Sequence, residues 1–74
     1  MLEQLTTIIH EYKADKSIIV SEDTIIKEDL DMSSFDLIQL ACLVEDEFDV
    51  EIPDRAIKDF KTIADVIRFI EENQ

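Results

Sequence analysis

Few residues of this 74-residue chain carry side chains that commonly perform chemistry, and their spacing limits what they can do. The single histidine, His10, lies in the first apolar-periodic segment, and it could act as a general base only if the fold brought a nucleophile to it. We expect it to be an ordinary helix residue that faces solvent or lies at the boundary between core and solvent. The single cysteine, Cys42, permits neither an internal disulfide nor a multi-cysteine zinc site.

Glycine is absent from the chain. Phosphate-cradling loops and dinucleotide-binding fingerprints need glycine so that backbone N–H groups can approach the ligand closely. The strained nucleophile turn of hydrolases needs it as well, and the calcium-loop pattern of aspartates followed by glycine is also missing. The sequence therefore predicts no catalytic residue and no metal site, which argues against a self-contained enzyme.

Two adjacent serines, Ser33 and Ser34, are the remaining candidates, and they stand where a helical pattern of apolar residues begins. A serine at an N-cap accepts a hydrogen bond from a backbone N–H that has no partner within the helix, so capping is the simplest role for either one. We expect this helix to run to about Glu47. Its apolar residues cover most of its circumference, so it is either buried on several sides or keeps an apolar face for a partner.

The apolar spacing elsewhere predicts an all-α fold, a small four-helix bundle with three longer helices and one short helix. Residues 2–14 form the first amphipathic helix. Residues 15–33 lack the helical period, and their apolar runs are too short for a stable sheet, so we predict a long ordered loop between the first two helices. The loop residues that we expect to contact the core are Ile18, Val20, Ile26 and Leu30.

The remainder of the bundle follows from helix start signals. Pro53 favours a stop or the first turn of a new helix, so a short helix is expected over residues 54–60. Thr62 then caps a final helix, with Asp65 as the acid of a capping box. A chain of this length suffices for one domain, and we expect residues 1–74 to form it.

Acidic residues dominate the charge, with 19 Asp and Glu against 7 Lys and Arg and a net charge of −12. Nucleic acids and anionic membranes are bound through clustered Lys and Arg, so both are disfavoured as partners. No apolar run approaches the roughly 20 residues that span a bilayer, and no signal-peptide pattern precedes the first helix. We expect a cytoplasmic monomer that neither inserts into membranes nor binds nucleic acid.

The stretch from Glu28 to Asp54 holds ten of the acids and none of the bases. A charge run is often only a solvated face, but this one surrounds an unusually apolar helix, which favours a docking surface for basic partners. One stripe of that helix is either part of the core or an apolar seam edged by carboxylates. Its residues are Phe35, Gln39, Cys42 and Asp46. The residues that we expect to contact partners are Phe35, Asp36, Gln39, Cys42, Glu45 and Asp46.

Several runs carry a resemblance to a known family. Residues 29–36, DLDMSSFD, resemble the D-L-G-x-D-S-L-D signature of acyl carrier proteins. Residues 47–54, EFDVEIPD, resemble the E-F-x-x-E-I-P-D connector of the same family, and residues 62–70 resemble the start and body of its last helix. The likeness covers nearly the whole chain, and the connector is its more specific motif.

The resemblance implies a four-helix bundle and a serine that receives a covalent 4′-phosphopantetheine arm from coenzyme A. Acyl intermediates are then held as thioesters on the terminal thiol of the arm. Ser34 matches the modified serine, because its spacing to Asp36 and to the connector fits the family. A serine hydroxyl is a poor nucleophile without an adjacent base, so a phosphopantetheinyl transferase must activate it. The chain would therefore be a substrate of that enzyme and not itself a catalyst.

The sequence departs from the family pattern near this serine. Ser33 stands where the family has aspartate, which leaves Ser33 open as the alternative attachment site. Asp31 replaces the usual glycine of the loop, and Phe35 replaces the usual leucine. Gln39 replaces an acid that commonly faces partner enzymes in the family.

The resemblance implies partners among acyl synthases and acyltransferases with basic docking surfaces, in fatty-acid or polyketide synthesis. A peptidyl or D-alanyl carrier stays open within the same class, since phenylalanine after the serine also occurs there. A helical adaptor that lacks the arm and only binds proteins stays open as a different class.

Overall fold

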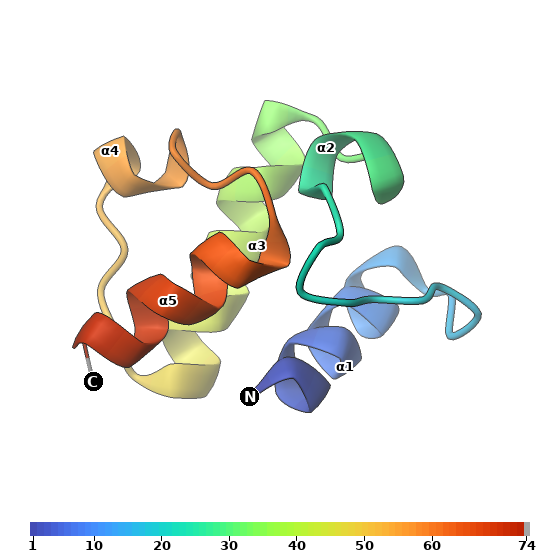
Figure 1. Cartoon of the computed structure of the whole chain (residues 1–74), viewed down its shortest axis with the longest axis horizontal. Helices are drawn as coiled ribbons and strands as arrows, with labels where there is room; N and C mark the ends of the chain where they lie inside the picture. The colour runs from blue at the N-terminus through green and yellow to red at the C-terminus, as the bar shows by residue number, and fades with distance from the viewer. Residues whose placement is uncertain (74) are drawn as a thin grey trace.

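The computed structural model describes residues 1–73, and this part of the chain contains five helices and no strand (Figure 1). Three of the helices are long and two are single turns, so the expected all-α architecture with three longer helices is confirmed. The helices are α1 (Leu2–Lys13), α2 (Ile26–Asp29), α3 (Ser34–Phe48), α4 (Asp54–Ile57) and α5 (Ile63–Asn73).

The long loop predicted between the first two longer helices contains a helical turn, α2, that the sequence did not indicate. The turn is held from outside, because the Ile26 N–H donates to the Lys61 carbonyl at 2.9 Å and the Ile63 N–H donates to the Thr24 carbonyl at 3.1 Å. Asp29 accepts a hydrogen bond from the Ile25 N–H at 2.8 Å. Four residues are too few to show a helical period, so tertiary contacts decide this element.

The helix α3 is the central element, and it packs against α1, α2 and α4. The buried side chains around it come from every helix and from the connectors, so one core joins the whole fold. Ile26 and Leu30 are buried, and Ile18 and Val20 pack against the core partly buried, which confirms that these four residues hold the loop.

The last part of the bundle follows the predicted start signals. The Asp65 N–H donates to the Thr62 hydroxyl at 3.3 Å, and the Asp65 carboxylate accepts from the Thr62 N–H at 3.0 Å, which is the expected reciprocal cap of α5. The helix α4 ends at Ile57, earlier than predicted. Phe60 leaves the helix to lie in the core, edge-on to Phe69 with ring centroids 5.8 Å apart.

Among residues 1–73, three residues adopt positive φ, namely Ala14, Asp31 and Asp49, although the chain contains no glycine. Asp31 has φ 51°, and it occupies the loop position where the acyl carrier family has glycine. Aspartate visits this left-handed region more readily than most residues do, because its short polar side chain can bond locally. An aspartate in place of glycine is therefore compatible with the left-handed backbone at this position.

The residues that the structure describes include no helix both long and apolar enough to cross a membrane.

The neighbouring isoleucines of the loop provide a test of how α2 is held. Ile26 is 0% exposed, whereas Ile25 is 39% exposed. We expect Ile26→Val to lower the free energy of unfolding by about 0.5–1.5 kcal/mol, because it removes a buried methyl group, and Ile25→Val to change it by less than about 0.5 kcal/mol. Urea unfolding followed by circular dichroism measures both, and equal losses would contradict the anchoring role of Ile26.

Candidate functional site

The start of α3 separates the two candidate serines. Ser33 is the N-cap, with extended backbone at φ −80° and ψ 177°. Its hydroxyl oxygen accepts a hydrogen bond from the Asp36 N–H at 3.2 Å, and the Asp36 carboxylate accepts one from the Ser33 N–H at 2.9 Å. The two residues form a capping box, so the Ser33 hydroxyl is engaged in holding the helix start.

Ser34 is the first residue of α3, and its side chain is exposed. The ammonium group of Lys27, from α2, donates to the Ser34 hydroxyl oxygen at 3.3 Å. The hydroxyl therefore lies on the surface beside a positive charge, where another protein can reach it.

A groove of about 330 Å³ opens beside this hydroxyl, between α2, α3 and α4. It is apolar along its α3 and α4 sides and charged at its edges. Its lining residues are Lys27, Ser34, Leu37, Ile38, Asp54, Ile57 and Lys58. The groove therefore combines an apolar surface with charged edges next to the Ser34 hydroxyl.

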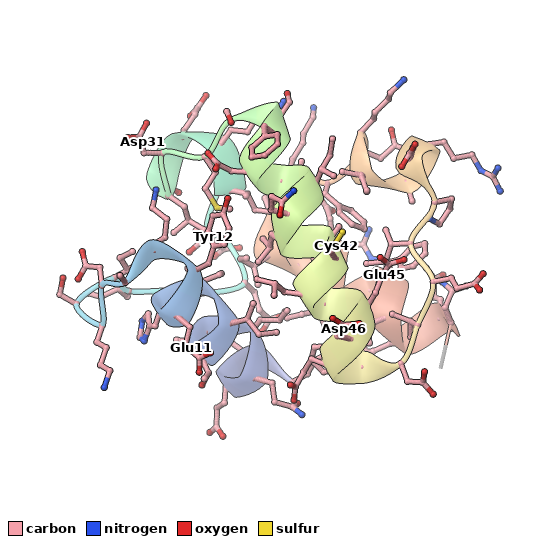
Figure 2. All side chains as sticks on the ribbon, turned by 180° about the vertical axis from the view of Figure 1, so that it is seen from behind. Glu11, Tyr12, Asp31, Cys42, Glu45 and Asp46 are labelled. Atoms are coloured by element: carbon pink, nitrogen blue, oxygen red, sulfur yellow. The ribbon has the colours of Figure 1, made fainter. Side chains whose placement is uncertain are left out.

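A hydrogen bond from α1 fixes the same helix start. The Tyr12 hydroxyl donates to the Asp36 carboxylate at 2.7 Å, and Figure 2 shows Tyr12 extending from α1 toward the beginning of α3. Hydrogen bonding from the Ser33 backbone, followed by that from Tyr12, lowers the pKa of Asp36. The same bond raises the pKa of Tyr12, because it favours the protonated phenol.

The lowered pKa of Asp36 makes the stability that the helix start contributes depend on pH. The ionised Asp36 carboxylate stabilises the folded state fully above its ordinary pKa of 3.8. This contribution is lost as the pH falls through the lowered pKa of the folded protein. At neutral pH the cap is therefore at full strength.

The predicted stripe on α3 lies at the surface. Phe35, Gln39, Cys42 and Asp46 are all exposed, and Figure 2 shows Cys42 and Asp46 on the outward side of α3. Phe35 is 66% exposed, which is unusual for so large an apolar ring. Of the two readings of this stripe, the surface seam is therefore the one that the structure supports.

Two acids of the predicted docking set already have partners inside the domain. Asp36 bonds to Ser33 and Tyr12, and Glu45 accepts a hydrogen bond from the Ile52 N–H at 2.8 Å. The Glu45 bond ties α3 to the connector that precedes α4. Asp46 is the remaining acid of the set, and it is exposed.

Sequence reasoning missed two features near the serine. Ile38, at 46% exposed, lines the groove, whereas the apolar pattern of the helix had left open whether such residues are buried or exposed. Lys27 contacts Ser34 although it was assigned to a loop. The seven-residue separation between Lys27 and Ser34 crosses a turn, so no periodic signal could have revealed that contact.

The histidine has a structural role. The His10 Nε2 donates to the Ile18 carbonyl at 2.7 Å, which holds the chain that leaves α1. His10 is a half-buried residue within α1, which confirms the expected boundary position between core and solvent.

Charge compensation within the domain is sparse. Among residues 1–73 a single ion pair forms, between Arg68 and Asp65 at 3.9 Å, and no group of three or more potential metal ligands gathers. The exposed acids of α3, Asp46 among them, can therefore attract cationic groups of another molecule.

An exposed serine at the start of a central helix, beside an apolar groove and an acidic face, defines a small helical domain suited to carrying an attached group. Comparison with known proteins agrees. The family model described as a phosphopantetheine attachment site matches residues 3–70.

Relatives in the same comparison share this domain over nearly its full length. The acyl carrier protein of Thermobifida fusca (strain YX) is 36% identical over 72 residues, which cover 97% of this chain and 91% of that protein. The acyl carrier protein of Prochlorococcus marinus (strain MIT 9515) is 34% identical over 71 residues, which cover 96% and 89%. The crystal structure of an acyl carrier protein from Thermotoga maritima superposes with a TM-score of 0.83 at 28% identity, covering 95% of this chain and 81% of that one.

The chain therefore belongs to the acyl carrier protein family. Members of this family are carrier domains, generally without catalysis of their own, and they carry a covalently attached 4′-phosphopantetheine.

The hydrogen bond between Tyr12 and Asp36 yields a direct test of the helix start. In Tyr12→Phe the Asp36 carboxylate loses a donor, so we expect its pKa to rise toward the ordinary value while remaining below it, because the Ser33 bonds persist. A pH titration of the side-chain carboxyl carbon by NMR measures this shift. Asp65, whose pKa is lowered by its own bonds to Thr62 and Lys61, is the internal control. An unchanged Asp36 titration in Tyr12→Phe would contradict the interhelical bond.

Proposed function

We propose that Ser34 receives the 4′-phosphopantetheine arm and that the domain holds acyl intermediates as thioesters on its terminal thiol. The domain then presents these intermediates to enzymes of fatty-acid or polyketide synthesis. One observation at the start of α3 carries the assignment of Ser34. The side chain of Ser33 caps the helix, whereas the side chain of Ser34 does not.

Arm attachment follows the chemistry of phosphoryl transfer. The Ser34 oxygen attacks the phosphorus of coenzyme A that bears the pantetheine, and a new oxygen–phosphorus bond forms. The pyrophosphate bond breaks, and the adenosine bisphosphate portion leaves. The serine proton passes to a base of the transferase, because the side chain that hydrogen-bonds the Ser34 hydroxyl is a lysine ammonium, which cannot accept a proton.

The residues around Ser34 fit such an arm. The hydroxyl is exposed, a lysine ammonium stands beside it, and an apolar groove begins at the same point. When bound, the arm supplies the thiol that forms the thioester, while the protein binds and orients it.

We further propose that partner enzymes dock on the exposed face of α3. Phe35 and Cys42 offer apolar contact area, and Asp46 offers a carboxylate to basic partners. Asp36 and Glu45 remain candidates for contact, but their carboxylates also serve the fold, so substituting them tests two things at once. Gln39 contributes no charge, which weakens this face relative to the acid usual in the family.

Two other functions can be distinguished by whether the domain gains the arm and by which group is then loaded on it. A peptidyl or D-alanyl carrier uses the same arm and differs in being loaded with an amino acid. An adaptor without the arm shows no mass gain with coenzyme A and a transferase. The exposed Ser34 and the match to the attachment-site family favour a carrier over an adaptor.

Mass spectrometry after incubation with coenzyme A and a phosphopantetheinyl transferase tests the attachment site. We expect the mass gain of one phosphopantetheine on the wild-type protein and on Ser33→Ala, and none on Ser34→Ala. Ser33→Ala also removes the N-cap, so we expect it to lower the free energy of unfolding by about 0.5–2 kcal/mol. Ser33→Asp restores a capping side chain and serves as the stable control. A full mass gain on Ser34→Ala would overturn the assignment.

Charge reversal at Asp46 tests the docking face without disturbing an internal hydrogen bond. We expect Asp46→Lys to lower kcat/KM for arm transfer several-fold at low salt, mainly through slower association, and the difference to shrink at high salt. Glu71→Lys changes the net charge equally on an exposed residue of α5 and is the matched control. Phe35→Ala is expected to speed dissociation instead. Equal effects of Asp46→Lys and Glu71→Lys would place the docking face elsewhere.

A further inference from the structure

We propose that Lys27 and Lys58 bind the phosphate of the arm and hold its first part over the groove between α2, α3 and α4. The two lysines would then act as positioning residues for the attached group. This inference rests on attachment at Ser34, and it concerns where the arm begins its path along the surface.

The contact between Lys27 and Ser34 supplies the geometry. The Lys27 ammonium lies 3.3 Å from the Ser34 hydroxyl oxygen, which becomes the bridging oxygen of the phosphodiester when the arm is attached. The non-bridging phosphate oxygens would then lie two bonds from this oxygen, on the other side of the phosphorus. A lysine side chain is flexible and carries three donors, so a small movement brings its ammonium onto those oxygens.

Lys58, the residue that follows α4, lines the same groove. The groove therefore has a lysine from each of two segments that are far apart in the sequence. Asp54 also lines it and opposes anion binding, so the groove carries two positive side chains against one negative side chain.

Two lysines beside one groove are unusual in so acidic a chain. The chain has 7 basic residues against 19 acidic ones, yet two of the seven line this one groove. A phosphodiester carries one negative charge, and most of the surface of a domain with net charge −12 would repel it. The lysines provide a favourable position directly beside the point of attachment.

The apolar part of the groove suits the next part of the arm. The side chains of Leu37, Ile38 and Ile57 line the same groove as the two lysines. The pantoic portion of the arm follows the phosphate and bears two methyl groups. A phosphate held by Lys27 and Lys58 would bring these methyl groups onto apolar side chains, which reduces the volume that the arm explores near its base.

Phosphorus NMR of the loaded protein tests this contact directly. We expect the phosphodiester resonance of Lys27→Gln, and to a smaller extent that of Lys58→Gln, to differ from the wild-type resonance at low salt. Lys27→Arg keeps the charge and should stay close to the wild type. Lys16→Gln, at an exposed residue of the loop after α1 that does not line the groove, changes the net charge equally and should leave the resonance unchanged. The differences should fade near 1 M salt, where screening acts within about 3 Å.

Thermal unfolding of the apo and loaded forms provides a second readout. An exposed ion pair changes the unfolding equilibrium constant by up to about five-fold. In the wild type, the ion pair between Lys27 and the phosphate stabilises the loaded form. Lys27→Gln lacks this ion pair, so loading should raise its unfolding equilibrium constant by about two- to five-fold relative to the effect of loading on the wild type. The apo form of each variant supplies the baseline, so any effect of the substitution on folding itself is removed.

The outcomes separate this inference from the function on which it rests. Failure of the wild-type protein to gain the arm on Ser34 would overturn both. Normal loading, with the same phosphorus resonance and the same apo-to-loaded stability difference in Lys27→Gln as in Lys16→Gln, would overturn the lysine contact alone.

Discussion

The reciprocal hydrogen bonds between Ser33 and Asp36 determine what the start of α3 can do. Because they end the preceding loop at Ser33, they make Ser34 the first helical residue and leave its hydroxyl outside the cap. Tyr12 fastens the same carboxylate to α1, so the position of the serine is set by two helices and not by one flexible turn. A group attached at Ser34 would therefore start from a defined point.

The surface around Ser34 has an acidic part and a part that carries lysines. The stretch from Glu28 to Asp54 carries acids without a base, whereas Lys27 and Lys58 come from either side of it and line the groove next to Ser34. An acidic, partly apolar face on α3 is suited to basic partners, while the two lysines are suited to a phosphate. Both roles fit on a domain this small because they use opposite charges on neighbouring surfaces.

Local patterns predicted the long helices and the cap of α5. Thr62 with Asp65 is a signal that needs only three residues of context, and the structure contains this pair. The sequence left open which of the two adjacent serines caps α3, and the structure shows that Ser33 does so, with Asp36 as its partner. The turn α2 could not be predicted in this way, because backbone bonds to the segment before α5 hold it. The internal bonds of Glu45 and the contact of Lys27 with Ser34 depend likewise on elements that meet only in the folded chain.

The central claim is that the cap of α3 selects Ser34 over Ser33. The most direct measurement is fragmentation mass spectrometry of the tryptic peptide 28–55 from the loaded wild-type protein, since this peptide contains both serines and no other. We expect the fragment ions to carry the phosphopantetheine mass on Ser34, with Ser33 unmodified. Fragment ions that carry it on Ser33 would contradict the assignment, because the residue that caps the helix would then be the one that is modified.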